Sequence, residues 1–262
     1  MLIVWGRKKT SRVLGYVADF CFLCRGPRAF KLIRNGSVGH VYYISFGEGK
    51  LVGYERTCTE CGERFAADIT TYSNVAEALV PVDELKHSTY PNFDSVMQER
   101  IELEKRVQKS PDSLSASERY ALIKAPFLLL ASKVETQFSS PTKTDWRTGL
   151  ALFAAIVLPF LAGFAVCQLE SPSPDRVDHC LIAAGAAFFV GIAFTAWQIV
   201  LSNRRFISRE VVPVLAKSLA PLHPSEAEIT NVLDELKRLR LKMASKLTTA
   251  ELYKFLQNSP YR

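Results

Sequence analysis

The chain has few histidines and none of the spacings that mark a familiar catalytic site. Its four histidines are scattered, with no H-E-x-x-H pair among them, at His40, His87, His179 and His223. No nucleophile–base signature is present either. The glycine-rich segment Gly47–Gly53 has the wrong spacing for a nucleotide-binding fingerprint, and it predicts a hairpin turn instead. The sequence therefore gives no support to an enzyme activity.

Charged residues are missing from two long stretches in the second half of the chain. Thr148–Gln168 and Cys180–Leu201 contain no ionisable group other than a thiol, and each is long enough to cross about 30 Å of hydrocarbon. The short proline-rich segment Glu170–His179 between them predicts a turn. We expect a transmembrane hairpin over residues 148–201, with spans 148–168 and 180–201. A buried hairpin in the core of a soluble protein is the alternative.

Basic residues predict the orientation of this hairpin, because Lys and Arg are enriched on the cytoplasmic side of membrane helices. The two outer flanks hold most of them, and the connecting loop holds one, in the order Lys133, Lys143, Arg147, then Arg176, then Arg204, Arg205, Arg209 and Lys217. We therefore expect both termini in the cytoplasm and the loop outside. Trp146 and Trp197 lie near the cytoplasmic ends, where interfacial anchors are expected.

Cysteine is scarce, but four of the six cysteines form two C-x-x-C pairs, Cys21 with Cys24 and Cys58 with Cys61. Two residues between thiolates let both sulfurs bind one ion, and two such pairs supply the four ligands of tetrahedral structural zinc. We predict that these four cysteines bind zinc. Iron is the alternative, because four thiolates also bind iron in this geometry.

The remaining two cysteines, Cys167 and Cys180, lie at the outer ends of the two predicted spans. A disulfide between them in an oxidising periplasm would close the hairpin. Two free thiols in membrane helices are the simpler interpretation, and we favour it.

Short apolar runs separated by turn residues predict a small β unit over residues 1–67, too small to fold on burial alone. Its motifs are Ile3-Val4-Trp5-Gly6, Leu14-Gly15, the two cysteine pairs and the closing Cys61-Gly62-x-x-Phe65. Together they resemble the rubredoxin-like zinc-ribbon family called zinc-ribbon 15, which opens small bacterial proteins of unknown role, often with membrane segments. The first pair departs from the family pattern, with Phe22 for Pro and Arg25 for Gly. The resemblance implies a metal site and no activity.

Helical patterns cover most of the remaining chain. We expect a cytoplasmic helical region over residues 68–140 and a cytoplasmic helical tail over residues 202–262. Ser115 and Glu118 form a capping box before a predicted helix Tyr120–Phe138, which Pro126 should kink or split. The fold class is thus a small β zinc ribbon followed by a mostly α region with a two-helix transmembrane hairpin.

A long amphipathic helix is predicted in the tail, capped by Ser225 and reaching Leu247. Its apolar stripe has the 3–4 spacing of one helix face, with the members Ile229, Val232, Leu236, Leu239, Met243 and Leu247. Such a helix is marginal in water unless the stripe is buried. It should pack on the chain's own middle helices, on a second copy as a coiled coil, or on another protein.

The function expected from these features is that of a membrane-anchored zinc-ribbon protein, serving protein interaction or assembly at the bacterial inner membrane. An iron electron-transfer module and a membrane-tethered nucleic-acid binder are the alternatives. The net charge of +7 fits anionic lipid headgroups as well as phosphates of nucleic acid. We expect the lipid bilayer as a partner, a second copy or a protein bound through residues 225–247, and no nucleic acid.

Overall fold

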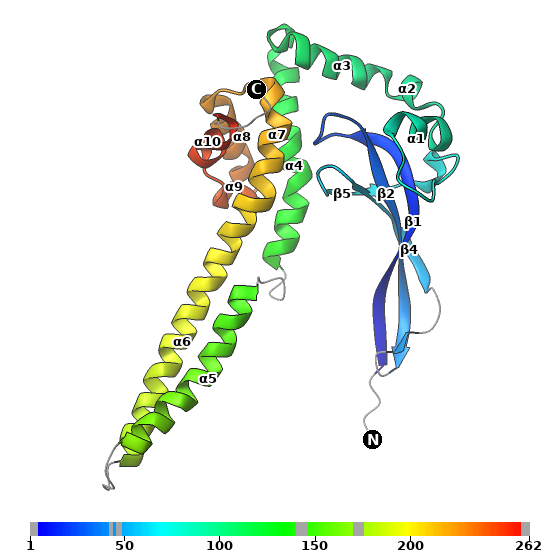
Figure 1. Cartoon of the computed structure of the whole chain (residues 1–262). Helices are drawn as coiled ribbons and strands as arrows, with labels where there is room; N and C mark the ends of the chain where they lie inside the picture. The colour runs from blue at the N-terminus through cyan, green and yellow to red at the C-terminus, as the bar shows by residue number, and fades with distance from the viewer. Residues whose placement is uncertain (1–4, 42–43, 46–48, 140–145, 170–175, 258–262) are drawn as a thin grey trace. The chain divides into compact units, whose positions relative to one another are not determined.

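The computed structural model describes residues 5–41, 44–45, 49–139, 146–169 and 176–257 (Figure 1). The chain divides into two compact units, which are described separately. The first contains the residues up to Pro126 together with Val214–Pro224, and the second contains Phe127–Pro213 together with Ser225–Asn258.

An antiparallel sheet forms most of the first unit. Its strands β1 to β5 follow the order β1-β2-β4-β5, with the short β3 also pairing with β2, and they span Trp5–Cys21, Gly26–Val41, Ile44–Ser45, Lys50–Cys58 and Arg64–Ala67. The pairing of Cys21 with Gly26 places the β1–β2 turn directly after Cys21. The pairing of Phe30 with Cys58 brings the end of β4 beside the start of β2. The predicted β unit is confirmed, and its strands are longer than the apolar runs because β1 and β2 continue through charged residues.

Helices close one side of this unit's core. They are α1, α2 and α3, which span Val82–Thr89, Phe93–Val96 and Gln98–Lys109 (Figure 1). Ala18, Ala29 and Leu85 form a buried cluster between the sheet and α1. The Thr89 hydroxyl accepts a hydrogen bond from the backbone N–H of Ala18 at 3.0 Å, which satisfies a buried donor. The helix α1 is thereby fixed to β1, the strand that ends in Cys21.

The helix α4, Ala116–Ser139, confirms the predicted capping box and continues past the proline that was expected to kink or split it. The Ser115 hydroxyl accepts from the backbone N–H of Glu118, and the Glu118 carboxylate accepts from the N–H of Ser115. Pro126 lies inside the helix without splitting it. Its missing N–H removes one hydrogen bond, while burial of apolar side chains on both sides of it, Ile123 and Phe127 among them, holds the helix together.

Two apolar helices, α5 (Trp146–Leu169) and α6 (Arg176–Phe206), lie antiparallel to each other (Figure 1). Their length and composition suffice to cross a membrane. Most of their side chains face outward. Only 22% of the most apolar stretch of α5 is buried, and only 17% of the most apolar stretch of Val177–Leu222, the long helical run that begins with α6. A core helix of a soluble protein would be mostly buried, and these two helices are not.

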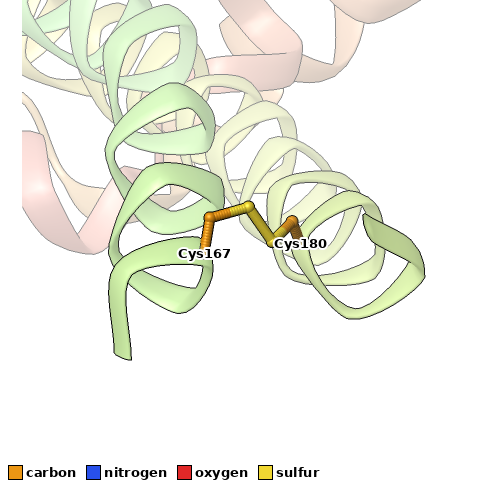
Figure 2. The surroundings of a disulfide bond; sticks show 2 residues. All are labelled: Cys167 and Cys180. Atoms are coloured by element: carbon orange, nitrogen blue, oxygen red, sulfur yellow. A yellow bond between two sulfur atoms is a disulfide. The ribbon is translucent and has the colours of Figure 1, made fainter. Parts of the chain in front are cut away.

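The two apolar helices contact each other closely and are covalently joined. A Cβ at Gly191 of α6 would lie 2.8 Å from the Cα of Ala155, so the approach of α5 at this point depends on glycine. At the other end of the pair a disulfide links Cys167 and Cys180, whose Cα atoms are 5.6 Å apart (Figure 2). The prediction of two free thiols is therefore wrong. Antiparallel packing brings these residues together, and their spacing along the sequence does not show this.

The tail contains several short elements rather than the predicted long helix. After η3 (Ile207–Val211) the elements are α7, η4, α8, α9 and α10, which span Val212–Leu219, Ala220–Leu222, Glu226–Arg238, Lys242–Lys246 and Thr249–Gln257. The predicted cap at Ser225 is confirmed, and it is part of a capping box, because Glu228 N–H donates to the Ser225 hydroxyl and the Glu228 carboxylate accepts from Ser225 N–H.

The predicted continuation of this helix to Leu247 is wrong, because a Schellman motif ends it. Arg240 adopts a left-handed conformation with a φ of 57°. Leu241 N–H donates to the Leu236 carbonyl, and Arg240 N–H donates to the Lys237 carbonyl. The left-handed position of this motif is usually glycine, so an arginine there left no signal in the sequence.

The apolar stripe is nevertheless buried within the chain, apart from one member. Ile229, Val232, Leu236 and Met243 are fully buried, and Leu239, which lies where α8 ends, is 55% exposed. Packing of α8 against α9 and α10 within the second unit thus covers the face that the sequence predicted to need a partner. Association with another chain through residues 225–247 stays a prediction.

Candidate metal centre

The first cysteine pair forms the turn between β1 and β2. Cys21 is the last residue of β1, and Gly26 is the first of β2. The N–H of Cys24 donates to the Cys21 sulfur at 3.4 Å, as expected when a turn wraps around a thiolate. Leu23, between the two cysteines, is 1% exposed, and its burial in the core holds the β1–β2 turn in place.

The second pair forms the turn between β4 and β5. Gly62 N–H donates to the Cys58 carbonyl at 2.9 Å, and Cys58 N–H donates to the Glu63 carbonyl at 2.9 Å. Thr59 attaches this turn to β2, because its N–H and its hydroxyl both donate to the Ala29 carbonyl. Gly62 follows the second cysteine with a φ of 73°, a conformation that favours glycine.

All four predicted cysteines come together in one cluster. Their sulfur atoms lie within 4.8 Å of one another, with Cys21 to Cys61 at 3.7 Å and Cys24 to Cys58 at 4.0 Å. Four sulfurs around one zinc at 2.3 Å would be about 3.8 Å apart. The cluster therefore fits a tetrahedral metal ion, and this geometry is shared by zinc and iron. Cys21 and Cys58 are buried, and Cys24 and Cys61 are partly exposed.

The four thiols shift one another's pKa through hydrogen bonds between their sulfurs. Hydrogen bonds donated by the other three sulfurs lower the pKa of Cys58. Hydrogen bonds between Cys21 and the other three sulfurs, together with burial, raise the pKa of Cys21. A metal ion would bind the four sulfurs as thiolates and release their protons.

Arg25 completes the first turn in an unexpected way. It has a φ of 56°, a left-handed conformation that favours glycine. Its side chain is buried and forms an ion pair with Glu104 of α3, with Nε to Oε2 at 2.7 Å. Its Nη1 also donates to the Ser218 carbonyl near the end of α7 at 3.2 Å. A cation at a helix C-terminus is favoured by the helix dipole.

Further side chains connect the two turns to helices of the same unit. Glu104 also accepts from Arg100 at 2.6 Å, and the Arg100 guanidinium lies 5.3 Å from the ring centre of Phe22. The second turn is connected through Glu60, which accepts from the Lys217 ammonium at 2.7 Å. This hydrogen bond and the lysine charge lower the pKa of Glu60. The metal centre is thereby connected to α3 and α7, far from it in sequence.

Sequence reasoning found the four clustered cysteines and missed the residues around them. Arg25 was visible only as a departure from the family pattern. Its partners Glu104 and Ser218 lie 79 and 193 residues away, and no local spacing predicts such pairs. A charged residue at a position that requires a positive φ is the one available signal, because a side chain there must be held by something.

Comparison with known proteins adds no family to this description. No family model matches the chain, and no curated protein or solved structure matches it. The interpretation of the site rests on its geometry and chemistry.

Proposed function

We propose that this chain is an integral membrane protein of the bacterial inner membrane whose cytoplasmic zinc ribbon is a module for protein interaction or assembly. The clustering of four sulfurs at the edge lengths of a ZnS₄ tetrahedron carries the proposal. Four protein ligands fill a tetrahedral site and leave no position for a substrate, so the ion is structural rather than catalytic.

Zinc is favoured over iron by what surrounds the site. Both turns are held by ion pairs and hydrogen bonds to helices, through Arg25 and through Glu60. A metal ion would join the β1–β2 turn to the β4–β5 turn between these attachments, which is a structural task that redox-inert zinc performs. An iron electron-transfer module remains the competing function, and metal analysis separates the two.

The two kinds of cysteine support the proposed orientation. Cys21, Cys24, Cys58 and Cys61 are free thiols, as in a reducing compartment, whereas Cys167 and Cys180 are bridged, as in an oxidising one. A hairpin that crosses the inner membrane twice places its connecting loop in the periplasm and both flanks in the cytoplasm. The basic flanks of the hairpin favour the same orientation.

The metal is tested on the full chain purified in detergent, with and without zinc in the growth medium. Elemental analysis should find one zinc per chain. Cys58→Ser should lose the metal, and Cys167→Ser should retain it, because that thiol lies outside the cluster. Iron at one per chain would contradict the zinc site and favour electron transfer, and absence of any metal would contradict both.

The interaction role is tested in native membranes by chemical cross-linking. Proteins that cross-link to the intact chain and to Cys167→Ser, but not to Cys58→Ser, would depend on the folded ribbon. Identical cross-links in all three would show that the ribbon does not make the contact.

A further inference from the structure

A cavity in the second unit lies where the second apolar helix becomes polar. It has a volume of about 730 Å³ and lies between the end of α6, η3 and the segment that joins α9 to α10. Its walls combine basic, hydroxyl and apolar side chains, among them Arg204, Arg205, Lys246, Ser208, Val200 and Phe138. Figure 1 shows α9 and α10 beside the upper part of α6.

The pairing of α5 and α6 indicates at what level of the proposed membrane this cavity lies. The Thr148 hydroxyl lies 3.5 Å from the Gln198 carbonyl, so the start of α5 is level with this part of α6. Trp146 and Trp197 at this level are 70% and 61% exposed, as expected of side chains at a membrane–water boundary. Arg204 lies about 9 Å beyond Gln198 along the helix axis, and only about 4.5 Å beyond Leu201, where the uncharged run ends. The headgroup layer on each side of the hydrocarbon is about 5–8 Å thick, so the cavity falls within it.

The polar walls of the cavity match a phosphate. Arg204, Arg205 and Lys246 contribute three positive charges, against one carboxylate, Glu251. One Glu251 oxygen is already occupied, because the Ser208 hydroxyl donates to it at 2.6 Å. Arginine and lysine side chains bind phosphate oxygens through charge-assisted hydrogen bonds.

We propose that this cavity binds the headgroup of an anionic phospholipid from the cytoplasmic leaflet. The proposal rests on the proposed insertion of α5 and α6 in the membrane. Val200 and Phe138 supply an apolar wall on which a glycerol backbone and the first acyl carbons can lie. Glu251 offers an acceptor for a headgroup hydroxyl. A lipid uses both features, whereas a free phosphate ion uses neither.

The test uses the full chain purified in a neutral detergent and titrated with phosphatidylglycerol or phosphatidylcholine, with bound lipids counted by native mass spectrometry. The intact chain should bind one phosphatidylglycerol in preference to phosphatidylcholine. The triple variant Arg204→Gln, Arg205→Gln and Lys246→Gln should bind phosphatidylglycerol about 100-fold more weakly, at roughly fivefold for each charge.

A matched variant removes three positive charges from the tail outside the cavity: Lys237→Gln, Arg238→Gln and Lys254→Gln, all exposed residues. It should bind phosphatidylglycerol as the intact chain does. An equal loss in both triple variants would overturn the proposal in favour of unspecific charge attraction. Equal binding of the two lipids by the intact chain would also overturn it. Displacement of the lipid by millimolar inorganic phosphate would reassign the cavity to a soluble phosphate and overturn the lipid proposal.

Failure of the membrane proposal itself gives a different result. Alkaline carbonate should leave the chain in the membrane pellet if α5 and α6 span the bilayer. Release into the supernatant would contradict the membrane anchor and the lipid site together. Retention in the pellet without selectivity for phosphatidylglycerol would contradict the lipid site alone.

Discussion

The ion pair between Arg25 and Glu104 allows a quantitative prediction about the metal centre. Both side chains are 5% exposed, and their atoms are 2.7 Å apart. Removing one partner of a buried pair costs about 3–5 kcal/mol, because the other charge is left buried. Arg25 would keep its hydrogen bond to the Ser218 carbonyl. We therefore expect Glu104→Ala to cost about 3 kcal/mol, the lower end of that range.

The loss should appear in metal affinity, because the binding of a structural metal is coupled to the folding of its site. A cost of about 3 kcal/mol corresponds to roughly 100-fold weaker apparent zinc binding. Competition with a chromophoric chelator on the full chain in detergent measures this affinity. Glu102→Ala is the matched control, since Glu102 lies on the same helix α3 and is exposed. Its effect should stay within about 0.5 kcal/mol.

The strained backbone of Arg25 refines the prediction. Arg25→Gly loses the ion pair but relieves a left-handed conformation that costs a non-glycine residue roughly 1–2 kcal/mol. Glu104 would still pair with Arg100. This variant should therefore bind zinc more tightly than Glu104→Ala does. Equal zinc affinity of Glu104→Ala and Glu102→Ala would refute the role given to the ion pair.

Three further predictions concern the second unit. Mass spectrometry of unreduced membranes should find Cys167–Cys180 bridged, and two freely alkylated thiols there would contradict a periplasmic loop. Gly191→Leu should lower the thermal aggregation midpoint in detergent, because the added side chain overpacks the contact with α5 at a cost of about 1–3 kcal/mol. Gly185→Leu should not, because the space at its Cβ position is open. Equal midpoints of the two variants would show that the close approach is not required. Leu236→Glu should expose the tail to limited proteolysis because it buries a charge, and Leu239→Glu at the surface should not; resistance of both would argue against the buried stripe.

Features encoded over a few neighbouring residues were predictable from the sequence. Two residues between paired cysteines identified all four candidate ligands, because a thiolate pair needs only local backbone to face one ion. Long uncharged runs identified α5 and α6, and Ser225 before an apolar stripe identified the start of α8. Each of these signals depends on contacts within a few residues, so spacing alone expresses it.

Two local features were nevertheless hidden. Arg240 ends α8 in a left-handed conformation, although glycine is the usual residue there. Pro126 does not split α4, because its neighbours Ile123 and Phe127 are buried. In both cases tertiary packing outweighs the intrinsic preference of one residue.

The sequence by itself determined the four candidate metal-binding cysteines, the two apolar helices and the basic flanks that favour one orientation. Only the tertiary structure decided what surrounds them. The Glu60–Lys217 contact joins residues 157 positions apart, and the cavity at Arg204 takes its walls from α4, α6, η3, α9 and α10. The disulfide between Cys167 and Cys180 likewise depends on two helices packing antiparallel. Such contacts form between segments that are far apart in the sequence. Burial of the whole core, rather than any local pattern, decides which of these segments lie side by side.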